Sequence, residues 1–239
     1  MKGVAAKYMP VLVFSFALLV RFLVFLCIPI DWKSVSYHLW QIGYFTLHIG
    51  LKYGRMWDLH GCEYLYPILP SLTQAFLMWL FRTSSMLPFR VLNMVLSSLT
   101  ASLIYLLGKE HFNERVGLSA ALFVSLFPGL VIWNLLNLYE SMAVFFFVAA
   151  LYLYGKGRLF VSGMLMALAS NCRTEFWVIT LGICLYALIY ERRNITEKAA
   201  PLILGWISAM LPFLLIYRSH TGNPIYPLYY GMFGGFGFN

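Results

Sequence analysis

Long apolar segments recur along almost the whole chain, from Met9 to Tyr217, and they limit the fold more than any other feature. Hydrophobic residues make up 61% of the 239 residues and charged residues only 11%, against roughly a quarter in soluble domains. A soluble core cannot bury so much apolar surface, so lipid must be the solvent for most of the chain. The composition therefore indicates a multi-pass membrane protein and excludes a soluble enzyme, a nucleic-acid-binding protein and a disordered tail.

The apolar segments are close enough in length to the roughly 20 residues of a membrane-spanning helix to be counted as spans. They cover residues 10–30, 88–108, 116–136, 141–154, 159–170, 176–190 and 199–217. A further stretch, residues 66–81, contains Pro67, Pro70 and Gln74, which favour a helix at the membrane surface over one that crosses. We therefore predict an all-α integral membrane protein with about seven transmembrane helices.

The basic residues predict the orientation of these helices. If the N-terminus is cytoplasmic and residues 66–81 do not cross, short cytoplasmic segments hold Lys2, Lys7, Lys109, Arg115, Lys156, Arg158, Arg192, Arg193 and Lys198. Because basic residues gather in cytoplasmic loops, this orientation is favoured, and it accounts for much of the net charge of +8. Residues 1–239 then form one transmembrane module, with a long first outer loop (31–87) carrying interfacial helices and an outer C-terminal loop (218–239).

The same orientation divides the acidic residues into two groups. The cytoplasmic turns hold Glu110, Glu114, Glu191 and Glu197, and the outer side holds Asp31, Asp58, Glu63, Glu140 and Glu175. A carboxylate at membrane depth costs several kcal/mol unless it is paired or hydrated. The gathering of acids on one side therefore predicts a hydrated site there. The alternative is that these acids are ordinary solvated charges of outer loops and form no site.

Three of the outer residues carry the candidate chemistry. Asp31 directly follows the first span, where a carboxylate held at the water boundary can accept a proton from a hydroxyl group. Glu140 begins the fourth span, so it is either a site residue or a partner for the helix dipole. Arg173 lies between the fifth and sixth spans and either binds a phosphate oxygen or pairs locally with Glu175.

The cysteines predict neither a metal site nor a disulfide framework. Cys27, Cys62, Cys172 and Cys184 form no CxxC pair and have no histidine at metal-ligand spacing. We interpret them as buried thiols.

The order of these features resembles the GT-C superfamily, the multi-pass glycosyltransferases that use lipid-phosphate-linked sugars. Dolichyl-phosphate-mannose enzymes and aminoarabinose transferases belong to it. The resemblance rests on an acid after the first span (Asp31), a long outer loop with a Tyr-Pro-rich helix, an arginine opening the second span (Arg90) and an acid at the second outer turn (Glu140). The turn at 108–115 and the segment at 221–227 agree with it, so it covers nearly the whole chain.

The resemblance implies a role for each candidate residue. Asp31 matches the catalytic base that deprotonates the acceptor hydroxyl, which attacks the anomeric carbon with inversion and displaces the lipid phosphate. Glu140 matches a second acid, which in relatives assists acceptor binding or, in the oligosaccharyl transferases, binds a metal, and it is the second catalytic candidate. The candidates for binding the donor phosphate are Arg173, Lys33 and Arg55. The candidates for binding the acceptor or substrate are Glu63, His38, Tyr66 and Asp58.

No cofactor follows firmly from the resemblance, and a divalent metal has only weak support. Many relatives have two adjacent acids after the first span, whereas Asp31 here is followed by Trp32, which weakens the case for a divalent metal. The glycines of residues 231–238 follow no predicted strand and open no predicted helix, so they do not form a nucleotide-binding loop.

The implied partners are a polyprenyl- or dolichyl-phosphate-linked sugar, with mannose as the expected hexose, a glycan, lipid or protein acceptor, and membrane lipid, but no nucleic acid. The site is expected on the extracytoplasmic side of the endoplasmic reticulum or plasma membrane. One alternative is a non-catalytic member of the fold that binds lipid or serves as a membrane subunit, because relatives generally continue beyond the seventh span. Another is a transporter, although no pair of broken helices occupies corresponding halves of the sequence.

Overall fold

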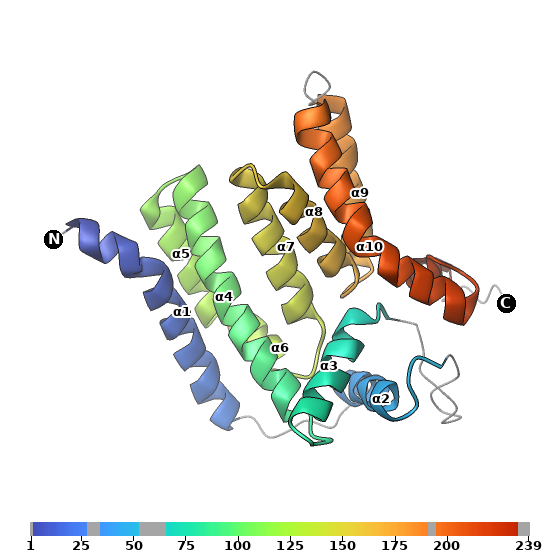
Figure 1. Cartoon of the computed structure of the whole chain (residues 1–239). Coiled ribbons are helices and arrows are strands. Elements are labelled where there is room, and N and C mark those ends of the chain that lie inside the picture. Colours follow the sequence, from blue (N-terminus) through green and yellow to red (C-terminus); the bar gives the residue numbers. More distant parts are fainter. Residues whose placement is uncertain (1, 28–33, 53–65, 191–194, 234–239) are drawn as a thin grey trace.

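The computed structural model describes residues 2–27, 34–52, 66–190 and 195–233 (Figure 1). Its helices are α1 (Lys2–Cys27), α2 (Ser34–His48), α3 (Leu69–Leu80), α4 (Leu87–His111), α5 (Glu114–Leu126), α6 (Pro128–Leu135), α7 (Glu140–Gly155), α8 (Leu159–Ser170), α9 (Glu175–Tyr190), a π-helical turn (Ile195–Ala199), α10 (Ala200–Thr221) and α11 (Tyr226–Phe233). These described residues form helices and no strands, so the prediction of an all-α membrane protein is confirmed.

Three helical segments are long and apolar enough to cross a membrane unaided: Tyr8–Cys27 in α1, Leu87–His111 and Ile195–Thr221. The apolar helices α7, α8 and α9 are shorter, and each coincides with a segment predicted to span. Large apolar side chains are exposed on α1, α9 and α10. Such exposure is expected of helices that lie in lipid, where apolar surface needs no protein cover.

The predicted third span, residues 116–136, is not one continuous helix. α5 ends at Leu126, Phe127 has extended backbone, and α6 begins at Pro128 with a bend of 59°. Proline has no N–H group and disfavours helical backbone in the residue before it, so this pair of residues breaks the helix. If α5 and α6 count as one broken span, four segments satisfy the length criterion.

The two ends of the bundle carry different turns. Figure 1 shows the α4–α5 turn beside the α7–α8 turn at one end, and Lys156 Nζ lies 2.8 Å from Glu110 Oε2 between them. At the opposite end α2 packs against α3, and Trp40 Nε1 donates a hydrogen bond to the Ser84 carbonyl (2.7 Å). This is the arrangement expected if the basic turns share one side of the membrane and α2 and α3 lie on the other.

Two buried arginines join helices inside the bundle. Arg21 of α1 donates hydrogen bonds to Ser97 Oγ of α4 (2.8 Å) and to the Val124 carbonyl of α5 (3.4 Å). Arg90 of α4, which the sequence placed at the start of a span, donates to the Leu135 carbonyl of α6 (2.6 Å). A cation at membrane depth is costly unless its donors are satisfied, so these bonds hold α1, α4, α5 and α6 together.

Glycines let neighbouring helices approach closely. A Cβ atom on Gly163 of α8 would overlap the Leu202 carbonyl of α10, and one on Gly205 of α10 would overlap the backbone of α8. Gly108 and Gly117 meet in the same way between α4 and α5. Small residues at helix crossings increase van der Waals contact, which holds helices together where lipid removes the hydrophobic driving force.

The predicted loop at 218–239 is partly helical. α10 continues to Thr221 and ends at Gly222, which has left-handed backbone (φ 77°), and α11 follows at Tyr226–Phe233. Glycine adopts this conformation without the steric cost that a Cβ atom brings, so it ends the helix at this position. The sequence had predicted a loop here, and α11 was overlooked.

The predicted burial of the cysteines is correct for two of them. Cys172 and Cys184 are buried, whereas Cys27 is exposed in the last turn of α1, and Cys62 lies outside the described residues. Leu23 of the same helix is exposed too, so this surface of α1 contacts no other part of the described protein and is suited to lipid.

We predict that Gly163→Ala destabilises the protein. The added methyl group overlaps the backbone of α10, and overpacking of this kind costs about 1–3 kcal/mol. The matched control is Gly182→Ala in α9, where an added Cβ meets no atom within 4 Å and alanine gains about 0.5–1 kcal/mol of helix stability. SDS titration followed by circular dichroism should show a lower unfolding midpoint for Gly163→Ala alone. Equal midpoints would contradict the close crossing.

Candidate active site

Arg173, in the turn between α8 and α9, binds two carboxylates. Its Nη1 donates to Glu140 Oε1 at 2.7 Å, its Nη2 donates to Glu175 Oε1 at 2.7 Å, and its Nε donates to Glu175 Oε2 at 3.2 Å. The sequence left open a local pair with Glu175, and that pair is present. The ion pair also extends to Glu140 at the start of α7, so it joins two turns that are distant in the sequence.

The three charged groups differ in exposure. The side chains are 29% exposed for Arg173, 36% for Glu140 and 58% for Glu175. Partial burial lowers the pKa of Arg173, but hydrogen bonding to Glu175 and the charges of both carboxylates outweigh it and leave the pKa above its ordinary value. Arg173 therefore stays cationic. With both carboxylates ionised, the cluster has one net negative charge.

Aromatic side chains lie beside this charged cluster. Tyr66 is near enough to Arg173 to contribute electrostatically to its raised pKa. The rings of His38 and Tyr66 meet edge to face with 6.1 Å between their centroids, and those of Tyr66 and Tyr139 do so at 6.3 Å. The structure thus gathers Glu140, Arg173, Tyr66 and His38, four predicted site residues, from separate parts of the chain.

A buried hydrogen-bond network stabilises the α8–α9 turn that carries Arg173. The Tyr217 hydroxyl of α10 donates to Asn171 Oδ1 (3.1 Å) and accepts the Ile68 N–H (3.1 Å). The Asn171 carbonyl in turn accepts the Leu69 N–H (3.2 Å). These bonds satisfy N–H groups at the start of α3, which have no partner within the helix, and join α3 to α8 and α10.

A second network holds the loop before α7. The Tyr139 hydroxyl donates to the Leu39 carbonyl of α2 (3.2 Å). Asn137 accepts a hydrogen bond from Gln74 Nε2 of α3 (3.1 Å) and donates to the Ser36 carbonyl of α2 (3.1 Å). Helices α2 and α3 are therefore bonded to the loop that positions Glu140, which gives this end of the bundle a defined geometry.

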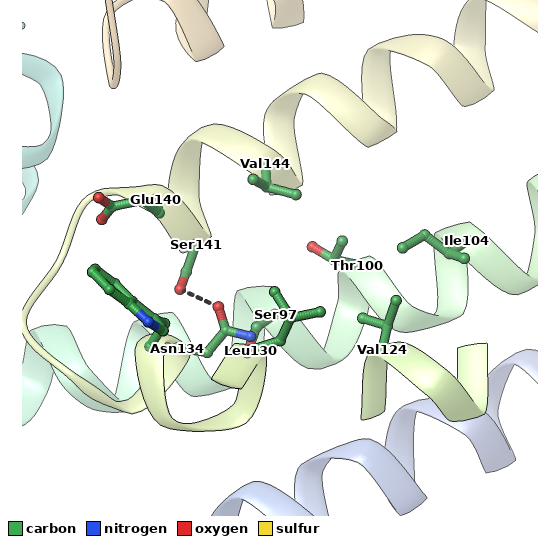
Figure 2. A pocket seen from close by; sticks show the side chains of 10 residues that line it. Ser97, Thr100, Ile104, Val124, Leu130, Asn134, Glu140, Ser141 and Val144 are labelled. Carbon is green, nitrogen blue, oxygen red and sulfur yellow. Dashed lines mark hydrogen bonds between the residues drawn. The ribbon is translucent and has the colours of Figure 1, made fainter. Parts of the chain in front are cut away.

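A cavity of about 460 Å³ adjoins the charged cluster (Figure 2). It is lined by Ser97, Thr100 and Ile104 of α4, Val124 of α5, Leu130, Trp133 and Asn134 of α6, and Glu140, Ser141 and Val144 of α7. Figure 2 shows Glu140, Ser141 and Asn134 at one end, with apolar side chains at the other. Its volume is in the range of small-molecule sites, and Glu140 belongs to both the cavity and the cluster.

Several predicted site residues lie outside the described residues, so their roles stay predictions. They are Asp31, Lys33, Arg55, Asp58 and Glu63. Within the described part of the chain, no group of three His, Cys, Asp or Glu side chains is placed to hold a metal ion.

Residues 66–218, well over half of the chain, match the family model for dolichyl-phosphate-mannose-protein mannosyltransferase. The chain belongs to this family. Comparison with curated proteins and comparison with solved structures each found no match. The family is one of membrane glycosyltransferases with the GT-C fold, so the resemblance drawn from the sequence is confirmed. The match includes Tyr66, Glu140 and Arg173, whereas Asp31 and His38 precede it.

Sequence reasoning missed the residues that support the site. Tyr217 and Asn171 were not singled out, although a tyrosine in the last turns of an apolar helix and an asparagine just before Arg173 are visible signals. Arg21 was missed as well, although an arginine inside a predicted span is a strong signal for a buried polar contact.

We predict that Tyr217→Phe loosens the start of α3. The substitution removes partners from the Ile68 N–H and from Asn171 Oδ1, and an unsatisfied buried group costs about 1–3 kcal/mol. Amide hydrogen exchange at residues 68–72 should accelerate, and the unfolding midpoint should fall. Tyr8→Phe, at an exposed tyrosine of α1, is the matched control and should change neither. Unchanged exchange in the Tyr217→Phe protein would show that the network does not hold α3.

Proposed function

We propose that this membrane glycosyltransferase moves a sugar, mannose by its family, from a polyprenyl- or dolichyl-phosphate donor to a hydroxyl acceptor on the extracytoplasmic side. The observation that carries the proposal is the Arg173–Glu140 ion pair, which brings a phosphate-binding cation beside a carboxylate at the end of the bundle opposite the basic turns. Tyr66 and His38 beside this pair supply aromatic and polar groups of the kind that hold sugars.

Arg173 binds the donor phosphate in this proposal. A planar guanidinium matches two phosphate oxygens at once, and it stabilises the charge that develops on the leaving phosphate. Glu175, which is 58% exposed, is the carboxylate that the phosphate replaces, while Glu140 keeps its bond to Arg173. Lys33 and Arg55 add positive charge to the donor site.

Asp31 is the general base. It takes the proton from the acceptor hydroxyl as that oxygen attacks the anomeric carbon from the face opposite the phosphate. The bond from carbon to phosphate oxygen breaks, lipid phosphate leaves with the bonding electrons, and the anomeric configuration inverts. Its position in the sequence supports this role, because Asp31 comes just before α2, and His38 of α2 packs against Tyr66, which interacts with Arg173.

The remaining predicted residues bind the acceptor or the sugar. Glu140 Oε2 is buried and has no hydrogen-bond partner among the described residues, so it is suited to accept a hydrogen bond from a substrate hydroxyl. His38 and Tyr66 contact the sugar or acceptor in the same space, and Glu63 and Asp58 contribute from the loop between α2 and α3.

Asp31→Asn is expected to lower kcat about 10²–10⁴-fold, since a positioned general base contributes a factor of that size. The measurement is transfer of labelled mannose from dolichyl-phosphate mannose by purified protein. Glu114→Gln, at the opposite end of the bundle, is the matched acid-to-amide control and should keep normal kcat. Normal turnover by the Asp31→Asn protein would show that another group is the base.

Arg173→Lys is expected to reduce kcat/KM for the donor about 10–100-fold, because lysine keeps the charge but loses the two-pronged contact, and a charged hydrogen bond contributes about 1.5–3 kcal/mol. Arg158→Lys, at the start of α8 and at the far end of the bundle, is the control and should leave kcat/KM unchanged. If both variants behave alike, Arg173 does not bind the donor.

The proposed orientation can be tested with single cysteines in a background where Cys27 and Cys62 are replaced by serine. In sealed vesicles with the cytoplasmic face inward, a membrane-impermeant maleimide should modify Ser84→Cys, because exposed Ser84 lies between α3 and α4. Phe112→Cys, in the exposed α4–α5 turn, should react only after the vesicles are opened. The reverse pattern would place the candidate site on the cytoplasmic side.

A further inference from the structure

The cavity beside Glu140 has a buried floor and an exposed rim. Ser97 and Thr100 of α4 are 3% and 4% exposed, whereas Leu130, Trp133 and Val144 are 39%, 56% and 40% exposed. These rim residues belong to α6 and α7, and their exposed side chains are apolar. In a membrane helix such a surface faces lipid, so the cavity is open to a molecule that enters from the bilayer.

The hydroxyl groups that line the cavity are already bonded within the protein. Ser97 Oγ donates to the Met94 carbonyl (3.1 Å), Thr100 Oγ1 donates to the Leu96 carbonyl (2.9 Å), and Ser141 Oγ donates to Asn134 Oδ1 (2.9 Å; Figure 2). Because these donors need no ligand, an apolar occupant leaves none of them unsatisfied. The body of the cavity is therefore suited to a hydrocarbon chain.

The end of the cavity at Glu140 has a different chemistry. Glu140 Oε1 accepts a hydrogen bond from Arg173, and its buried Oε2 accepts none from the described residues. Of the three charged residues of the cluster, Glu140 alone lines the cavity, and its carboxylate opposes an anionic head group on this side. A neutral head group that offers an O–H donor is complementary to Glu140.

We propose that this cavity binds the hydrocarbon chain of a lipid with a neutral, hydroxyl-bearing head group, and that this lipid is the sugar acceptor. The lipid-binding part stands on the cavity alone, whereas the acceptor role rests on the function proposed above. Glu140 then separates two sites, with donor phosphate on the exposed Glu175 side of Arg173 and the acceptor lipid on the cavity side. The lipid hydroxyl oxygen bonds to the anomeric carbon, its proton passes to Asp31, and lipid phosphate leaves with the electrons of the broken bond.

Photolabelling tests the binding site without requiring catalysis. The probe is a monoacylglycerol with a diazirine in its acyl chain, incorporated into vesicles that contain the full-length protein. The comparison probe is a polyprenyl phosphate with a diazirine at the same distance from its head group. The neutral probe should label peptides from α4 and α7 at least five-fold more than those from α9, and the phosphate probe should not show this preference.

Val144→Trp fills the rim of the cavity and should reduce labelling of α4 at least five-fold. Val178→Trp is the matched control, because Val178 of α9 is 55% exposed, lies outside the cavity and receives the same substitution. It should leave labelling unchanged. Preferential labelling of α4 and α7 by the phosphate probe would overturn the proposal and assign the cavity to the donor chain, and equal labelling in both tryptophan variants would overturn it as well.

A transfer assay tests the acceptor role. Val144→Trp should lower mannose transfer to the monoacylglycerol at least ten-fold more than transfer to a short water-soluble glycoside, whereas Val178→Trp should alter neither. Equal loss with both acceptors would overturn the acceptor assignment. Selective photolabelling without transfer to any acceptor would count against the proposed function but leave the lipid site established.

Discussion

The structure depends on one constraint of lipid as a solvent: polar groups inside the bundle have no water to bond and must find partners within the protein. Arg21 meets this requirement through Ser97 and the Val124 carbonyl, which links α1 to α4 and α5. Arg90 does the same through the Leu135 carbonyl of α6. The apolar exterior, by contrast, requires no partner, so these few polar contacts and the close glycine crossings decide which helices are neighbours.

The candidate site depends on the same requirement at one end of the bundle. Tyr217, Asn171 and Ile68 are joined by hydrogen bonds next to the α8–α9 turn, and Asn137 is bonded to both α2 and α3. These contacts hold two turns in place, one carrying Arg173 and the other Glu140. The resulting ion pair is partly exposed and adjoins the cavity beside Glu140, which is the arrangement that the proposed transfer requires.

Much of the fold was predictable because lipid-facing helices have a strong local signal. Every predicted span overlaps helix in the described residues, and the segment at 66–81 contains α3, which packs against α2. The errors are local. The break at Phe127–Pro128 was overlooked because hydrophobicity alone does not report a bend, and α11 was overlooked because a short aromatic segment gives little helical periodicity.

Composition, charge distribution and residue order were enough to establish a helical membrane protein and the resemblance that the family match confirms. These properties can be read from the sequence because the suitability of each segment for lipid depends on the residues of that segment alone. The pairing of Arg173 with both Glu140 and Glu175, the Tyr217 network and the cavity beside Glu140 were decided only by the tertiary structure. Each needs side chains from helices distant in sequence, whose meeting depends on how close the backbones come and not on any local pattern.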